Sequence, residues 1–202
     1  MKVFTTLLIF ISVIIYVSVF SPVIEVKIRY LSDQIGSIKY GIGGESYNTF
    51  QKTLTPVNTD FSITIPKIAA TSPVIDEVDP NDPIKYLPAL KRGVAHVLGS
   101  ANPGDNGNVY LFAHSTDAFY NVPKYNAVFF LLGKLSAGDD IYIYYKDRRF
   151  KYEVDTVKIV GPNEIDYLAG SPDTKTLTIQ TGYPAGTVNK RLIVTANEIG
   201  LQ

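Results

Sequence analysis

The sequence contains no cysteine, which excludes disulfide bonds and thiolate metal sites. Its two histidines, His96 and His114, lack the His-x-x-x-His spacing that is typical of zinc sites. The chain also has no net charge, because its 19 basic and 19 acidic residues balance. The basic residues are scattered, whereas nucleic-acid and anionic membrane surfaces need them clustered. We therefore expect no nucleic-acid partner and no cofactor.

Acidic residues occur in two short groups that could suggest calcium binding. Asp139 and Asp140 precede an alternating segment and fit a turn that enters a strand. Residues 79–83 fit a loop that is stiffened by its two prolines. We interpret both groups as loop residues and predict no metal site.

A long uncharged run stands near the N-terminus, from Val3 to Ile24. As a helix it would be roughly 33 Å long, enough to cross about 30 Å of hydrocarbon. We predict a single transmembrane anchor within residues 1–24. A cleaved signal peptide is the alternative, although Ser18-Val19-Phe20 is a poor cleavage site. Basic residues flank both ends of the run, so charge does not favour an outside position for the rest of the chain.

The remainder divides into a spacer and one domain. Residues 25–58 are rich in glycine and small polar residues, although a helix could continue out of the membrane as far as Ile35. Residues 59–202 are long enough to form one hydrophobic core.

Alternation of apolar and polar residues predicts that this domain is all-β. The alternating segments are 61–65, 141–145, 151–156, 177–179 and 191–196. Short helical turns are predicted at 84–91 and 127–132. Many short strands joined by turns favour a closed or nearly closed barrel.

The C-terminal region carries the most specific motif. Leu177–Thr187 with Lys190–Val194 resembles the catalytic end of a sortase, a membrane-anchored cysteine transpeptidase. The resemblance continues, in chain order and without large gaps, through most of the domain: 61–68, 90–96, 103–108, 109–115, 129–135 and 138–145. It implies an eight-stranded barrel with short helices, preceded by the transmembrane helix.

The resemblance also implies the site residues. His114 matches the catalytic histidine, in a segment that ends a strand, and Arg191 matches the catalytic arginine. Gly182 stands where the family has its cysteine nucleophile. In a working member, the thiolate attacks a threonine carbonyl of a sorting signal, and an amine then resolves the acyl-enzyme. Histidine handles protons, and arginine stabilises the developing oxyanion. Glycine has no side chain, so we expect this chain to be inactive.

Neighbouring hydroxyls are poor substitutes for the thiol. Thr181 and Tyr183 flank the position and should point to the opposite face of the strand. Ser115, next to His114, faces the same objection. His96 is interpreted as a structural residue that packs or hydrogen-bonds within the fold.

The resemblance implies partners and location as well. The expected partners are an LPXTG-like sorting signal of secreted proteins and an amine acceptor on the cell wall or on another protein. The groove walls are expected at residues 115–125 and 160–175. A single-pass membrane protein, held by residues 3–24, would carry its C-terminal domain outside the cytoplasm.

Two function classes stay open on the sequence. In the first, the gene encodes an active transpeptidase, and Gly182 is a replacement of its cysteine. In the second, the chain is a natural pseudoenzyme that binds sorting signals or surface proteins without cleavage. The genomic codon for residue 182 would separate the two.

Overall fold

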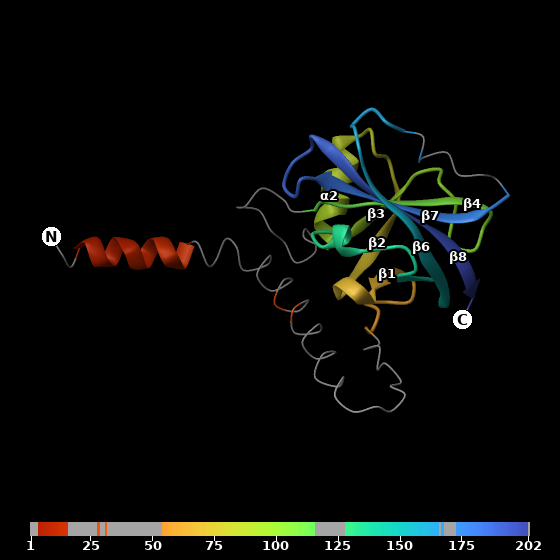
Figure 1. Ribbon diagram of the computed structural model, residues 1–202, viewed down its shortest axis with the longest axis horizontal. Helices are drawn as coiled ribbons and strands as arrows, with labels where there is room; N and C mark the ends of the chain where they lie inside the picture. Colours follow the sequence, from red (N-terminus) through yellow and green to blue (C-terminus); the bar gives the residue numbers. More distant parts are fainter. Residues whose placement is uncertain are drawn as a thin grey trace, which may run out of the picture.

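The structure, a computed structural model, describes residues 4–15, 28, 31, 54–115, 128–165, 167 and 173–201. Residues 4–15 form a helix, drawn at the N-terminal end of Figure 1. Among these described residues, no helix combines the length and apolar character needed to cross a membrane. The second half of the expected span and nearly all of the expected spacer, 25–58, lie outside the described residues.

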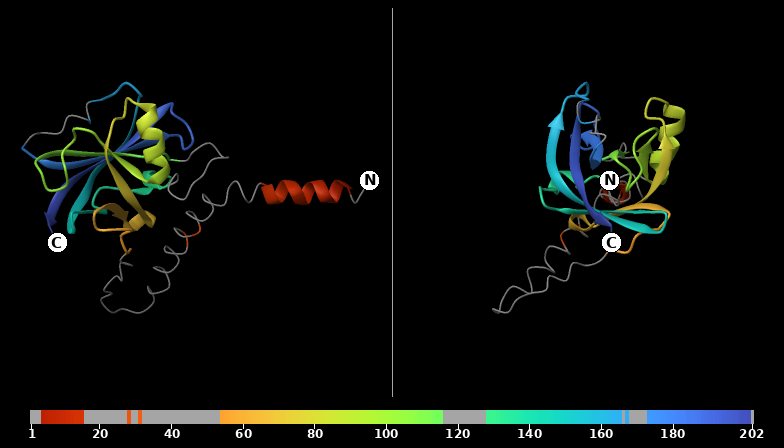
Figure 2. Two further views of the ribbon diagram at one scale, coloured as in Figure 1. Left: turned by 180° about the vertical axis from the view of Figure 1, so that it is seen from behind. Right: turned by 90° about the vertical axis from the view of Figure 1, so that its right-hand side faces the viewer.

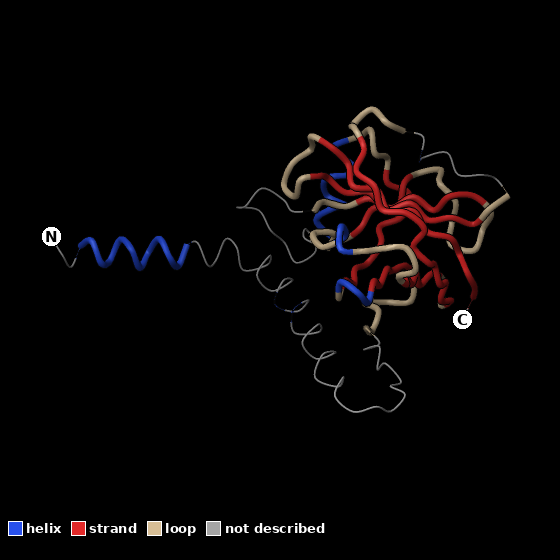
Figure 3. The backbone as a smooth tube through the Cα atoms, in the orientation of Figure 1, coloured by secondary structure: helices blue, strands red, loops and turns tan. Residues whose placement is uncertain are grey.

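Eight strands form a closed barrel, as predicted (Figures 1 and 3). Their order around the barrel is β1-β2-β3-β4-β7-β8-β6-β5. The strands are β1 (Phe61–Ile65), β2 (Ala70–Val78), β3 (Val94–Val97), β4 (Gly107–Phe112), β5 (Asp140–Tyr145), β6 (Arg148–Val160), β7 (Lys175–Tyr183) and β8 (Lys190–Leu201). Closure through the β1–β5 pair leaves neither strand as an open edge.

The barrel interior is filled by the inward-facing residue of each alternating pair. In β5, Ile141 and Ile143 are fully buried, while Tyr142 and Tyr144 on the other face are partly exposed. Burial of one such aliphatic side chain stabilises the fold by about 1.5–3 kcal/mol. Similar residues from the other strands complete the core: Ile63, Ile65, Val109, Leu111, Phe150, Tyr152, Leu177, Ile179 and Val194.

Helix α2 (Pro83–Arg92) contacts β2 and β3 (Figure 2), and it matches the predicted helical turn at 84–91. Asp82 begins the helix, because its side chain accepts a hydrogen bond from the backbone N–H of Ile84. The helix ends at Gly93, where a Cβ would lie 2.3 Å from the carbonyl oxygen of Pro73. Two short 3₁₀ helices, η1 (Pro66–Ile68) and η2 (Leu132–Lys134), complete the described helical elements of the domain.

The directions of the strands determine which strand ends lie at the same end of the barrel. Strands β4 and β7 are parallel, so both finish at the same end of the barrel. Strand β8 is antiparallel to β7 and therefore begins at that end. The segment after β4, the end of β7 and the start of β8 are thus neighbours, although they are far apart in the sequence.

Candidate active site

The three predicted site residues lie at this end of the barrel, Gly182 on β7, Arg191 on β8 and His114 two residues after the end of β4. Gly182 and Arg191 are direct partners in the β7–β8 ladder. Phe112 pairs with Gln180 in the β4–β7 ladder, and the N–H of Ala113 still donates to the Gln180 carbonyl at 3.2 Å. His114 follows directly, so the segment that carries it runs beside the last residues of β7. His114, Gly182 and Arg191, which we call the row, thus lie at one end of the barrel, on the segment after β4 and on two paired strands.

Residues that flank the row point into the barrel. Thr181 is 2% exposed, and its hydroxyl donates to the carbonyl of Ala113 at 2.8 Å. Leu192, on the other strand, is also buried in the core. Because strand side chains alternate between faces, the positions of Gly182 and Arg191 belong to the outer face. The prediction that Thr181 points away from the site is confirmed.

A turn covers Gly182. Residues 184–189, the β7–β8 turn, connect the two strands, and the carbonyl oxygen of Thr187 lies 2.3 Å from the place where a Cβ of residue 182 would stand. The N–H of Gly186 donates to Oγ of Ser115 at 3.2 Å. Within the turn, the N–H and the hydroxyl of Thr187 both donate to the carbonyl of Pro184, at 3.0 Å and 2.8 Å.

Ser115 corrects one expectation. The alternation of strand side chains predicted that its hydroxyl would point away from residue 182, yet Oγ lies 3.8 Å from the Cβ position there. The physical reason is that β4 ends at Phe112, so the alternation does not extend to residue 115. Ser115 is buried and serves as an acceptor for the β7–β8 turn.

The guanidinium of Arg191 contacts the same turn. Its Nη1 donates to the carbonyl of Val188 at 2.7 Å and to that of Lys190 at 3.2 Å. The positive charge also acts on two phenols of the outer face, Tyr110 and Tyr167, in the direction that lowers their pKa values. Burial outweighs it at both, so the pKa of each phenol is raised and each remains a hydrogen-bond donor near neutral pH.

These phenols belong to a polar cluster that the sequence reasoning missed. The hydroxyls of Tyr110 on β4 and Tyr167 both donate to Oε1 of Gln180 on β7, at 2.5 Å and 3.0 Å. The hydroxyl of Thr178 donates to the carbonyl of Tyr167 at 3.3 Å. Strand alternation could have predicted this cluster, because residues 110 on β4 and 180 on β7 lie on the same face of the sheet as residue 182. Tyr167 belongs to the predicted wall 160–175, whereas nearly all of 115–125 lies outside the described residues.

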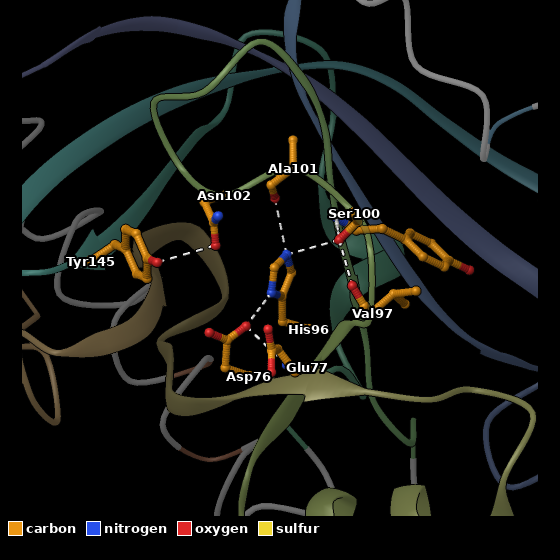
Figure 4. Close-up of polar contacts among 9 residues, drawn as sticks. Asp76, Glu77, His96, Val97, Ser100, Ala101, Asn102 and Tyr145 are labelled. Atoms are coloured by element: carbon orange, nitrogen blue, oxygen red, sulfur yellow. Dashed lines mark hydrogen bonds and ion pairs between the residues drawn. The ribbon is translucent and has the colours of Figure 1, made fainter.

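His96 is a structural residue, as predicted. Its Nδ1 lies 2.6 Å from Oδ1 of Asp76, and its Nε2 lies 2.8 Å from Oγ of Ser100 and 3.0 Å from the carbonyl of Ala101 (Figure 4). The ring of Phe61 packs against the imidazole edge to face, with centroids 5.4 Å apart. The side chain is 3% exposed, and its partners Ser100 and Ala101 belong to the loop that leads into β4.

The acidic groups have structural partners. Asp139 accepts from Lys67 Nζ at 2.7 Å, and Asp140, the first residue of β5, pairs with Lys151 Nζ at 2.9 Å. Asp82 caps α2, and Asp79 accepts from the N–H of Asn81. Within the part of the chain that the structure describes, no cluster of three or more histidine, cysteine or acidic residues could hold a metal ion.

Comparison with known proteins identifies relatives with this architecture. A family model described as "Sortase domain" matches residues 63–199. Sortase D of Bacillus subtilis (strain 168) is 29% identical over 133 residues, which cover 64% of this chain and 59% of that protein. The match thus spans less than two thirds of the relative.

Two solved structures are similar in three dimensions. A lid mutant of sortase A from Corynebacterium diphtheriae gives a TM-score of 0.59 at 29% identity, covering 72% of each chain. A Clostridium perfringens Sortase D5, described as a transpeptidase, gives a TM-score of 0.58 at 28% identity, covering 74% of this chain and 84% of the other.

Proposed function

Because the chain belongs to the sortase family, we propose that it recognises LPXTG-like C-terminal sorting signals of secreted proteins but lacks the covalent step. The family reaction joins the signal, through an enzyme thioester, to an amine on the cell wall or on another protein. In this chain the recognition would remain while the thioester could not form.

The row of His114, Gly182 and Arg191 is the observation that carries the proposal. In a transpeptidase, a nucleophile, a proton donor and an oxyanion stabiliser must act on one carbonyl group. Strands β7 and β8 and the segment after β4 bring the matching positions to one end of the barrel. The arrangement supports a site built for a peptide carbonyl, with the nucleophile's position occupied by glycine.

Nearby hydroxyls do not replace the nucleophile. Thr181 is directed into the barrel and donates to a backbone carbonyl. Ser115 is buried and accepts the N–H of Gly186. A hydroxyl also needs an adjacent general base before it attacks a carbonyl. We therefore propose that the chain binds sorting signals without cleaving them.

The polar cluster behind the row supports peptide binding at this face. Gln180 uses Oε1 to accept both Tyr110 and Tyr167, which fixes the amide plane. Its Nε2 group carries two hydrogen-bond donors, which suit the carbonyl oxygens of an extended peptide backbone. Tyr167 comes from the segment expected to form one groove wall.

A paired measurement tests the proposal. An LPXTG-containing peptide with a fluorescent label should bind the purified domain, and His114→Ala or Arg191→Ala should weaken binding. With an amine added, chromatography should show no product above buffer, and intact mass should show no adduct. A scrambled peptide is the control. Equal binding of both peptides, or turnover that Ser115→Ala abolishes, would contradict the proposal.

We further propose that the domain lies outside the cytoplasm, anchored to the membrane by residues 3–24. The support is the uncharged N-terminal run together with the family assignment. Protease added to intact cells should then degrade the domain. Protection that persists until lysis would overturn this placement.

The pseudoenzyme alternative, in which glycine is native at residue 182, agrees with one observation. The carbonyl of Thr187 occupies the volume that a side chain at residue 182 would need. A turn in this position is compatible with a glycine that is native to the chain, as the pseudoenzyme alternative requires. A glycine codon in the genome would agree with it, and a cysteine codon would reject it.

A further inference from the structure

The space above Gly182 is closed by backbone. The Thr187 oxygen lies 2.3 Å from the position of a Cβ on residue 182, whereas real Cβ atoms essentially never approach another heavy atom within 3.0 Å. The blocking atom belongs to the main chain, so a side-chain rotation cannot relieve the contact. Any residue larger than glycine must therefore move the β7–β8 turn.

The restriction at Gly182 comes from this contact and not from its dihedral angles. The glycines with positive φ are Gly99, Gly104, Gly107, Gly138, Gly186 and Gly200 among the described residues, so Gly182 has a backbone that other residues can adopt. If the turn moved away, alanine or cysteine would fit at this position without backbone strain.

The turn is held in place from both sides. Ser115 accepts the N–H of Gly186, which ties the turn to the segment after β4. Arg191 donates to the carbonyl of Val188, which ties it to the start of β8. Ser115 is next to the row and Arg191 is part of it, so a change in the turn also changes the surroundings of the site.

We propose that the β7–β8 turn is an autoinhibitory cover that docks through the Thr187 carbonyl onto Gly182. In the docked state, the turn occupies the volume from which a peptide carbonyl would approach residue 182. Glycine is required at this position by the docking contact. That a sorting-signal peptide displaces the turn rests on the proposed function; the docking itself does not.

Alanine substitution tests the docking directly. Gly182→Ala should lower Tm by about 5 °C or more, because the added methyl group overpacks the site. Gly133→Ala is the matched control: its Cβ would meet Leu192 Cδ2 at an ordinary 3.5 Å, and its φ is not positive. That variant should leave Tm unchanged or raise it slightly. A Gly182→Ala protein as stable as the wild type would overturn the proposal.

Amide hydrogen exchange provides a second reading that does not depend on Tm. The N–H groups of Gly186 and Thr187 are bonded in the docked turn. They should exchange on the order of tenfold faster in Gly182→Ala, while amides of β5 stay unchanged. Ser115→Ala, which removes only one tie, should accelerate the same two amides and serves if Gly182→Ala does not fold. Unchanged exchange in Ser115→Ala would contradict the docking.

Repeating the exchange experiment with added peptide separates the docking of the turn from the proposed sorting-signal function. Adding an LPXTG-containing peptide to the wild type should accelerate exchange at Gly186 and Thr187, because the turn has to move. Peptide binding that leaves both amides protected would overturn the cover. If no peptide binds while the alanine and exchange results hold, the docking stands and the sorting-signal function fails.

Discussion

Two regions of the barrel, around His96 and around Gly182, are packed in different ways. In the first region, the buried imidazole of His96 has an acceptor oxygen at each ring nitrogen, from Asp76 and Ala101. In the second region, where β4 and β7 finish, Gly182 has no side chain, and the Thr187 carbonyl closes over it. One region is thus completed by side-chain hydrogen bonds and the other by a backbone contact.

This difference concerns what each region requires of its residues. A buried polar ring must keep its partners, because an unpaired group in the interior costs about 1–3 kcal/mol. The turn over Gly182 carries no such buried polar ring, and under our proposal it moves when a peptide binds. The two histidines fall on different sides of this division: His96 is structural, and His114 belongs to the proposed site.

The largest effect on stability is expected for His96→Ala. The substitution removes a buried ring together with its hydrogen bonds to Asp76, Ser100 and the Ala101 carbonyl. The free energy of unfolding should fall by about 3 kcal/mol. Urea denaturation followed by fluorescence measures the change. A loss below about 1 kcal/mol would show that this region is not held by the histidine.

The variant His96→Gln separates hydrogen bonding from ring packing in the same experiment, because glutamine replaces part of the hydrogen bonding but not the ring. Glutamine can donate one hydrogen bond and accept another, so it should recover part of the lost free energy. Equal losses for Gln and Ala would mean that ring packing against Phe61, and not hydrogen bonding, carries the contribution of His96.

An intermediate effect is expected for Tyr110→Phe, which removes the hydrogen bond to Gln180. We expect a loss of about 1 kcal/mol at neutral pH. Burial raises the pKa of Tyr110 in the folded state above the usual value near 10. The unfolded chain therefore releases this proton first, and wild-type stability should fall as pH rises above about 10, with no such loss below it.

Thermal denaturation between pH 8 and 11 checks this pH dependence. The Tm difference between wild type and Tyr110→Phe should shrink as pH rises, because phenylalanine cannot ionise. A constant difference across the range would contradict the assignment of the raised pKa to this phenol.

The smallest effect on stability is expected for His114→Ala. The residue follows the end of β4 at a partly exposed position, so its removal should cost about 1 kcal/mol or less. Binding of the LPXTG-containing peptide should weaken clearly in the same variant. A stability loss as large as that of His96→Ala would remove the distinction between the two regions.

Much of the barrel could be predicted from the sequence where one face of a strand is apolar. In β5, Ile141 and Ile143 alternate with polar or aromatic residues, and the period of two is visible without a structure. Strand β2 was less visible, because Pro73 interrupts it and a bulge at Asp76 and Glu77 breaks its alternation. Glu77 even adopts a positive φ, at 53°.

The site was predictable only in part. The motifs identified His114, Gly182 and Arg191, because their segments resemble one family along the chain. The contact of Thr187 with residue 182 could not be predicted, since it depends on how the turn folds back over the strand. Ser115 was misassigned because strand alternation was extended beyond the end of β4.

The most direct test of the account is intact-mass measurement of Gly182→Cys after incubation with LPXTG-containing peptides. The cysteine should push the turn away, place a thiol between His114 and Arg191, and form a thioester adduct that an added amine resolves. The adduct should be lost when His114→Ala or Arg191→Ala is combined with Gly182→Cys. A folded Gly182→Cys protein that forms no adduct with any peptide of a broad sorting-signal library would contradict the central claim that this row is a sortase site without its nucleophile.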